Sequence, residues 1–344
     1  MPKRLNIHTF SKEAGYSVAT VSRALNPQTA AMVKPETRQK IQKLAAKLNF
    51  VPNAGARVLR RRRLAPVAVL LREKKGLFLS EYYSKLLMGI LAEASKRGQA
   101  VHAISFTPRK DDFLDQLNEA TVGCEAIIYL SDSLTAAMQS QLTNLHRPFI
   151  STPSGLTSTM EESQSKVPIF GLNELAGGQL ITQHLIDLGH KQIAYIGGPS
   201  VNHDASRRKE GFVLAMQQSN LPIRTEWMFE RTFDFKSGTE LAAHIQSLLG
   251  EATAVACASD EVALGLIHGL TQLGASCPQD VSITGYDDLQ WASRSLPTLT
   301  TIRQPLMRMA SITMQMIDDL KAGKSISNHL YEPELLVRDS TAKL

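Results

Sequence analysis

Eight short apolar runs occupy the chain from Pro66 onward, and amphipathic segments of about 12 to 18 residues separate most of them, a length typical of helices. The runs read VAVLL, AVHAISF, EAIIYL, RPFIS, PIFGL, QIAYIGG, TAVACAS and VSITGY. Apolar runs that alternate with helical segments are typical of parallel sheets with helices on both faces. Eight such strands exceed one compact sheet, so we expect an α/β domain of two similar parallel-sheet lobes.

The first 64 residues have a different composition. They contain fourteen lysines and arginines against only Glu13 and Glu36, whereas the whole chain has a formal charge of +6. The remainder is therefore net acidic. A basic patch confined to one end is typical of a protein with a polyanion partner, because each Lys or Arg that meets a phosphate releases condensed counterions. The alternative is a solvated basic tail.

The basic segment also contains the pattern of three short helices. Thr9 is expected to cap the first, which ends at Gly15, and Ser17 is expected to cap the second. The third begins at Pro35, since proline is favoured at the first helical position. Two helices joined by a tight Gly turn form a helix-turn-helix. Apolar residues at helical spacing are expected to close a small core: Val21, Ala24, Leu25, Ile41, Leu44, Ala45 and Leu48.

The segments SVATVSRALN and VKPETRQKIQKLAAKLNFVPNAGARVLRR resemble the lactose-repressor/galactose-repressor (LacI/GalR) family of bacterial transcription regulators. The resemblance covers essentially the whole chain. It implies an all-α helix-turn-helix head over residues 1–51, a hinge helix and basic linker over 52–64, and a periplasmic-binding-protein-like effector and dimerisation domain over 65–344. Within that domain, the N-lobe is expected at 65–168 and 299–327, and the C-lobe at 169–298 and 328–344. The chain would cross between lobes near Pro168, Leu296–Leu299 and Ser327.

The resemblance places the residues that read DNA bases at the start of the second helix. Val18 and Ala19 offer only apolar contact, such as to a thymine methyl group, whereas Arg23 suits a bidentate pair with guanine. The alternative is that Val18 and Ala19 are plain helix surface. Polar side chains nearby are expected to position the head on phosphates: Ser17, Thr20, Ser22 and Asn26.

The hinge is the second element that the resemblance assigns to DNA. In the family it folds on DNA, pairs with the hinge of a second subunit and inserts a leucine into the central base step of the minor groove. Leu59 matches that leucine. The expected minor-groove residues are Asn53, Ala56, Arg57, Leu59 and Arg60. Gly55 disfavours helix by roughly 1 kcal/mol, and the run Arg60–Arg63 adds charge suited to nonspecific binding.

The resemblance places effector-binding residues between the lobes. Arg208 and Asp287 present a guanidinium fork and a carboxylate, which suit vicinal hydroxyls or a carboxylate and an amine. Aromatic faces suit the C–H face of a sugar or a flat base. The full set is Tyr82, Tyr83, Asn173, Arg208, Phe233, Ser259 and Asp287. The alternatives are that Arg208 pairs with Glu210 on its own helix, that Asp287 caps a turn, and that the aromatic residues belong to the core.

Asn173-Glu174 stands where relatives usually have Asp-Asn. An acceptor-only carboxylate is thereby replaced by an amide that also donates, so we expect an unusual pattern of ligand hydroxyls.

Other chemistries have little support in the sequence. The three cysteines are widely spaced and favour reduced packing residues over disulfides. The histidines lack a metal-ligand spacing, and Gly197-Gly198 fits a turn better than a dinucleotide loop. No catalytic residue, metal or cofactor is expected. The sequence shows neither an apolar run of membrane-spanning length nor a signal peptide.

The sequence therefore predicts a cytoplasmic, nucleoid-associated transcriptional regulator, a repressor rather than an enzyme, that binds a palindromic operator in double-stranded DNA as a homodimer. A small molecule between the lobes would control operator affinity. Family analogy favours a sugar or sugar derivative, and a nucleoside or purine is the alternative. The rival interpretation is a carbohydrate-binding protein or enzyme with a nonspecific basic N-terminal segment.

Overall fold

The structure of the protein is a computed structural model, and it describes residues 6–25, 29–48, 50, 65–72, 80–107, 112–130, 134–142, 144–152 and 170–344. The chain divides into two compact units, Met1–Ala65 and Pro66–Leu344.

The first unit contains three α-helices and one 3-10 helix in its described part. These are α1 (Ile7–Ala14), α2 (Val18–Ala24), η1 (Ala30–Met32) and α3 (Pro35–Lys47). Their core contains the apolar stripes of all three α-helices, with Phe10, Val21, Ala24, Val33, Ile41, Ala45 and Phe50 buried and Leu25, Leu44 and Leu48 packed against them. The rings of Phe10 and Phe50 stack with their centroids 4.2 Å apart. The predicted three-helix core is confirmed.

Side chains fix the ends of the first two helices. Asn6 caps α1, where its side chain accepts from the backbone N–H of Thr9 at 2.9 Å and its own N–H donates to the Thr9 hydroxyl at 3.1 Å. The expected cap at Thr9 is therefore wrong, because Thr9 is the third helical residue that closes a capping box. The helix ends at Gly15, whose φ of 72° is the left-handed conformation that glycine tolerates. Ser17 caps α2 as predicted.

The second unit contains two four-stranded sheets in which all pairings are parallel. The first has the order β2-β1-β3-β4, with β1 (Val67–Arg72), β2 (Val101–Phe106), β3 (Ala126–Leu130) and β4 (Phe149–Thr152). The second has the order β7-β6-β8-β9, with β6 (Ile193–Gly197), β7 (Met228–Glu230), β8 (Ala254–Cys257) and β9 (Ser282–Thr284). Every predicted apolar run contains a strand, and β7 is the member of these two sheets that the sequence did not predict.

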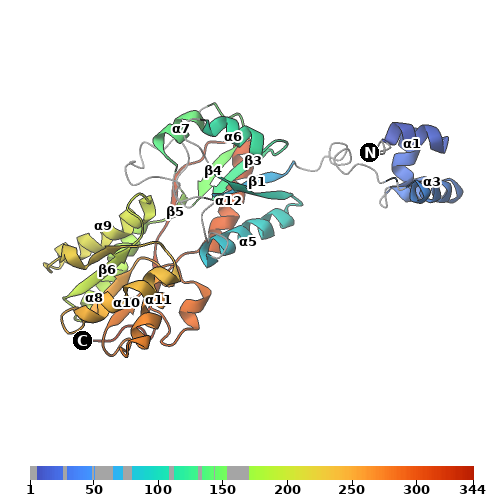
Figure 1. Cartoon of the computed structure of the whole chain (residues 1–344). Coiled ribbons are helices and arrows are strands. Elements are labelled where there is room, and N and C mark those ends of the chain that lie inside the picture. Colours follow the sequence, from blue (N-terminus) through green and yellow to red (C-terminus); the bar gives the residue numbers. More distant parts are fainter. Residues whose placement is uncertain are drawn as a thin grey trace. The chain divides into compact units, whose positions relative to one another are not determined.

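Helices cover the sheets in two separate lobes (Figure 1). The first lobe has α5 (Glu81–Lys96), α6 (Phe113–Ala120), α7 (Ala136–Leu142) and α12 (Leu306–Lys321), and α5 lies against α12. The second lobe has α8 (Glu174–Asp187), α9 (His203–Gln218), α10 (Phe235–Leu248) and α11 (Asp260–Gln272), with the short η4 (Thr225–Trp227) and η5 (Gln290–Ser293). Along β1, Val67, Val69 and Leu71 enter one core and Ala68 and Leu70 another. Both faces of the strand are therefore buried, as the continuous apolar run predicts.

Three segments join the lobes. The chain leaves the first lobe after β5 (Phe170–Leu172), returns after β10 (Thr301–Arg303), and leaves again between β11 (His329–Tyr331) and β12 (Glu334–Leu336). Strand β5 pairs in parallel with β11, and β10 pairs antiparallel with β12. Strand β5 lies against β4 of the first sheet, whereas β10 and β12 lie against α8, so β5 and its partner β11 belong to the first lobe.

The crossings therefore come a few residues later than expected near Pro168, Leu296–Leu299 and Ser327. Pro168 itself lies outside the described residues. The ring of Phe170 is fully buried and lies 6.0 Å from that of Tyr331, edge to face. An apolar run predicts a buried strand but does not identify the sheet it joins, and this explains the displaced boundaries.

Glycines allow α8 and α9 to approach closely. A Cβ atom at Gly178 would clash with the backbone carbonyl oxygen of Arg208, and a Cβ at Gly211 would clash with that of Leu175. The two helices therefore touch through their backbones at these positions. This contact sets the position from which the Arg208 side chain extends.

Substitution Gly178→Ala should consequently destabilise the protein. The added methyl group would meet a backbone atom that cannot rotate away, so we expect a loss of about 1–3 kcal/mol of unfolding free energy. Urea denaturation measures it. Gln179→Ala, one position along the helix, is the control and should stay within about 0.5 kcal/mol of the wild type; equal losses in both variants would contradict the close contact.

Candidate functional site

The predicted base-reading residues lie on α2 away from the small core of the first unit. Ala19 and Arg23 are exposed and Val18 is half-buried, whereas Val21 and Ala24 are fully buried on the inner side of the helix. A side chain as long as that of Arg23 reaches well beyond the helix surface. This arrangement leaves the predicted residues accessible to a partner.

The predicted phosphate contacts lie beside them. The hydroxyls of Ser17 and Thr20 are 2.9 Å apart at the start of α2, and Ser22 is half-buried one turn on. Other predicted DNA contacts lie outside the described residues, and their roles stay predictions: Asn26, Asn53, Ala56, Arg57, Leu59 and Arg60.

Arg208 is the centre of a buried polar cluster in the second lobe. Its Nε and Nη2 donate to the two carboxylate oxygens of Glu174 at 2.8 and 3.0 Å, and Nη1 donates to the carbonyl oxygen of Ala258 at 2.7 Å. Both side chains of this ion pair are more than nine-tenths buried. The alternative pairing with Glu210 is not observed, because Arg207 makes that contact on the surface at 2.5 Å.

Asp287 lies on the other side of the guanidinium. Its Oδ1 is 3.7 Å from Arg208 Nη1 and accepts from Gln304 Nε2 at 3.2 Å. The same amide nitrogen lies 3.4 Å from Glu174 Oε1, so Gln304 bridges the two carboxylates. Asp287 has a φ of 123°, which L-residues rarely adopt. Strain of this kind at a buried polar residue favours a functional role over a simple turn cap.

Two aromatic rings lie next to the guanidinium. Arg208 Cζ is 3.9 Å from the ring centroid of Tyr286 and 5.7 Å from that of Phe233. Glycines make room for both rings, since a Cβ at Gly177 would clash with the Tyr286 hydroxyl and a Cβ at Gly198 with the Phe233 ring. The rings therefore restrict the plane of the guanidinium and add cation–π attraction.

The first lobe contributes Tyr82 and Tyr83 from the first turn of α5. Their rings meet edge to face at 5.3 Å. The pKa of Tyr82 is raised well above its ordinary value. Burial is the largest cause, and the charges of Asp204, Tyr83, Asp287 and Glu174 follow in that order. The charges of carboxylates in the second lobe therefore act on the Tyr82 hydroxyl. Nearby, Glu81 Oε1 accepts from the backbone N–H of Gln290 at 2.6 Å, so the two lobes are in direct contact at the start of α5.

Ser259 and Asn173 cap helices beside the cluster. Ser259 Oγ accepts from the N–H of Glu261 at 3.2 Å at the start of α11, and Asn173 Oδ1 accepts from the N–H of Ala176 at 3.2 Å at the start of α8. Capping engages the side-chain oxygen of each residue. Contact of either residue with an effector stays a prediction.

Sequence reasoning missed three members of the cluster, namely Glu174, Tyr286 and Gln304. Glu174 and Tyr286 directly adjoin the predicted Asn173 and Asp287, which is the signal that was available. A side chain that caps a helix is already engaged by the backbone. Asn173 is a good helix cap, so Glu174 was the better candidate for the site. Gln304 had no signal, because its contacts lie far away in the sequence.

Burial dominates the electrostatics of these carboxylates. It raises the pKa of Glu174 and that of Asp287, although the charge of Arg208 opposes the rise in each. Burial also raises the pKa of Asp260 to about 7. Asp260 accepts from the Thr301 hydroxyl at 2.6 Å and from the N–H of Leu289 at 2.7 Å, and its charge contributes to the raised pKa of Asp287.

Asp260→Asn should change how stability depends on pH. A carboxyl group with a raised pKa in the folded state contributes stability below its unfolded pKa, and this contribution is lost as pH rises through the folded value of about 7. The slope approaches about 1.4 kcal/mol per pH unit for one proton. An asparagine can accept from Leu289 and donate to Thr301, so its stability relative to the wild type should increase with pH.

Chemical denaturation from mildly acidic to mildly alkaline pH measures this difference. His184 and His190, whose pKa values burial lowers, titrate in the same range but are present in both proteins and cancel. A difference that stays constant with pH would contradict the raised pKa of Asp260.

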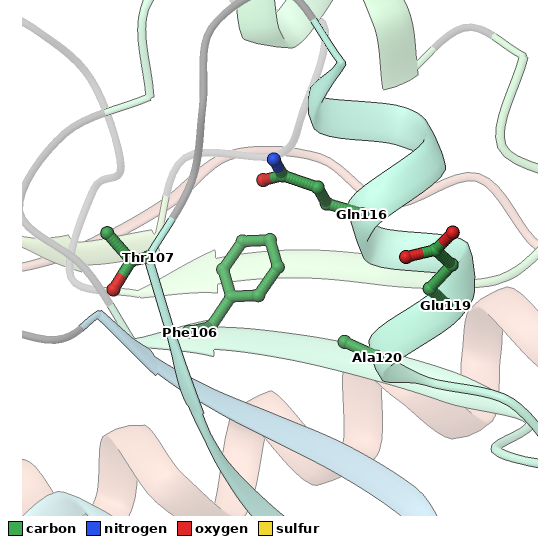
Figure 2. Close-up of a pocket in the computed structure, with 5 residues that line it drawn as sticks. All are labelled: Phe106, Thr107, Gln116, Glu119 and Ala120. Atoms are coloured by element: carbon green, nitrogen blue, oxygen red, sulfur yellow. The ribbon is translucent and has the colours of Figure 1, made fainter.

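A separate cavity of about 620 Å³ lies on the first lobe, open to solvent, between the end of β2 and α6 (Figure 2). It is lined by Phe106, Thr107, Gln116, Glu119 and Ala120. None of these was predicted to bind an effector, and none belongs to the Arg208 cluster.

In the described part of the chain, no helix is long and apolar enough to cross a membrane, and no group of three or more His, Cys, Asp or Glu side chains is arranged to hold a metal ion.

Family patterns match both units. The pattern described as bacterial regulatory proteins, lacI family, matches residues 7–53, and that of a periplasmic binding protein-like domain matches residues 182–341. The HTH-type transcriptional repressor PurR of Vibrio vulnificus (strain CMCP6) is 29% identical over 343 residues, which cover 98% of this chain and 99% of that protein. Catabolite control protein A of Priestia megaterium is 28% identical over 332 residues, covering 95% and 96%.

Solved structures show the same architecture. The complex of the transcriptional regulator CelR with cellobiose has a TM-score of 0.71 and 25% identity, covering 98% of this chain and 100% of that one. The lac repressor dimer bound to operator and the anti-inducer ONPF has a TM-score of 0.74 at 23% identity, covering 99% and 100%, and shares the fold. The helix-turn-helix head thus matches the lacI family of bacterial regulatory proteins, the two-lobed α/β domain matches the periplasmic binding protein-like domain, and the full length of the chain is similar to transcriptional repressors that combine the two.

Proposed function

We propose that this regulator is a repressor whose affinity for a palindromic operator depends on a small molecule bound between the two lobes. The second half of the proposal rests on the buried cluster of Arg208, Glu174 and Asp287 in one lobe, with a strained backbone at Asp287, and on the effect of its carboxylates on the pKa of Tyr82 in the other lobe. A ligand in contact with both groups would change the relative position of the lobes. Coupling of this kind is worth about 1–3 kcal/mol, or roughly 5- to 150-fold in DNA affinity.

A homodimer follows from the size of the head. A single helix-turn-helix reads only half a site, so specific binding requires two heads related by a two-fold axis. The similar lac repressor has been observed as a dimer on its operator. The proposed base-reading residues are Val18, Ala19 and Arg23. A protein that regulates transcription through operator DNA would act in the bacterial cytoplasm.

The similar proteins are regulators, and this supports a non-enzymatic role over the rival interpretation of an enzyme with a basic tail. Cellobiose on CelR supports a sugar as effector, with a nucleoside or purine as the alternative that the aromatic residues also suit. Turnover assays on candidate ligands discriminate the two interpretations, because a regulator binds its effector without converting it.

Selection from a random duplex DNA library tests the proposed operator. The full chain at physiological salt should enrich a two-fold symmetric site with a flexible pyrimidine–purine step at its centre. Binding that enriches no sequence and simply declines as salt increases would indicate a nonspecific basic tail.

Arg23→Ala should then weaken binding to the selected operator by roughly 10- to 150-fold, the range expected when about 1–3 kcal/mol of base discrimination is lost. Binding to unrelated DNA should change much less. Arg38→Ala, which removes the same charge from α3, is the matched control. Fluorescence anisotropy on both DNAs gives the specificity ratio, and an equal loss in both variants would argue against base reading by Arg23.

A further inference from the structure

The first turn of α5, in the first lobe, is not capped by the residue that precedes it. Ser80 stands at that position, but within the described residues its side chain makes no hydrogen bond to the N–H groups of the turn. The first backbone N–H groups of a helix have no partner inside the helix, so they need an acceptor from elsewhere. A negative charge near them is also favourable, because it meets the positive end of the helix dipole.

Glu261 in the second lobe supplies that acceptor. It lies in the first turn of α11, and its carboxylate accepts hydrogen bonds from the backbone N–H of Glu81 and from the Ser80 hydroxyl. Burial raises the pKa of this carboxyl group, and the two hydrogen bonds oppose the rise. A carboxylate of the second lobe therefore caps a helix of the first lobe.

Glu81 makes the reverse contact. Its Oε1 accepts from the backbone N–H of Gln290, the first residue of η5, at 2.6 Å. Leu289, which precedes η5, has an apolar side chain that cannot act as a cap. Each lobe thus provides a carboxylate that caps a helix of the other lobe. Because both contacts share the first turn of α5, a separation of the lobes at this point would break both of them.

Nearby charges oppose this pair of contacts. The negative charges of Asp234 and Glu81 add to the rise in the pKa of Glu261, so the two capping carboxylates repel each other. Lys85 pairs with Glu81 Oε1 at 2.8 Å and offsets part of this repulsion. Both carboxylates are also only partly buried, and water screens such contacts. The contacts are therefore expected to open without unfolding of either lobe.

We propose that Glu261 and Glu81 form a reciprocal latch that holds the two lobes in the observed arrangement, and that opening of this latch changes operator affinity. The latch consists of residues of this chain, so an effector would act by shifting the equilibrium between its closed and open states. This inference deepens the proposed function, because it names a contact through which the lobes are coupled. Its regulatory meaning rests on that function.

Amide hydrogen exchange tests whether the two contacts open together. Glu261→Ala removes one contact, and NMR of the full chain reports the other through the Gln290 amide. Loss of one hydrogen bond between the lobes should make that amide exchange about 5-fold faster. The neighbouring Leu289 amide donates to Asp260 within the second lobe at 2.7 Å, so its exchange should not change. Unchanged exchange at Gln290, or equal acceleration at Leu289, would overturn the latch.

Two further variants separate the latch from a general loss of charge. Glu261→Gln keeps an oxygen that accepts from the first turn of α5, so exchange at Gln290 should stay within about 2-fold of the wild type. Glu240→Ala removes an exposed carboxylate from α10 of the same lobe and should also leave that exchange unchanged. If either variant accelerates exchange at Gln290 as much as Glu261→Ala does, the capping contact is not the cause and the proposal fails.

Operator binding by the same variants distinguishes the latch from the proposed function. Glu261→Ala should change affinity for the selected operator by about 5-fold or more, the lower end of the usual range for coupling between sites. Glu240→Ala should not change it. Faster exchange at Gln290 without a change in operator affinity would contradict the regulatory half of the inference. If the wild type itself selects no operator, the proposed function fails, whereas the exchange rates decide independently whether the latch exists.

Discussion

The ion pair between Arg208 and Glu174 connects three parts of the second lobe. It links the start of α8 to α9, and the same guanidinium binds the end of β8 through the carbonyl of Ala258. Small residues are required around it, because Gly177 and Gly178 admit the Tyr286 ring and the backbone of α9. A buried ion pair seldom adds net stability over an apolar substitute. The ion pair lies beside a strained Asp287, so a role in ligand recognition explains it better than a contribution to the stability of the fold.

The same cluster couples the two lobes. Its carboxylates act on the pKa of Tyr82 in α5, and Glu81 on the same helical turn accepts from the backbone N–H of Gln290. Helix α5 packs on α12 within the core of the first lobe, so a displacement at its first turn moves a rigid packed unit rather than a loop. Because packed units switch between discrete arrangements, the proposed ligand would act by rotating one lobe relative to the other.

The sequence predicted the strands well and the boundaries of the lobes less well. Buried parallel strands require apolar side chains on both faces, and this is why runs such as AIIYL are recognised without a structure. The assignment of Phe170 failed because its burial against Tyr331 is a long-range contact that a strand pattern does not contain. Thr9 was assigned one role of the capping box and has the other, since a cap and its partner three residues on use similar side chains.

The candidate site shows the same division. Arg208 and Asp287 were identified from motif positions, but the partner of Arg208 lies 34 residues away in sequence and that of Asp287 lies 17 residues away. Partners at such separations are set by the packing of helices and crossing strands, and no local pattern encodes them. The consequence is chemical, because Arg208 alone suggests a free guanidinium, whereas the structure pairs it with Glu174.

Charge is distributed unevenly along the chain. The basic residues concentrate in the first 64 positions and the rest of the chain is net acidic. A basic head attracts DNA, and an acidic body is repelled by it, so that nonspecific contact is limited to the head. A polyanion partner is thereby directed to one end of the chain, away from the lobes that are proposed to bind the effector.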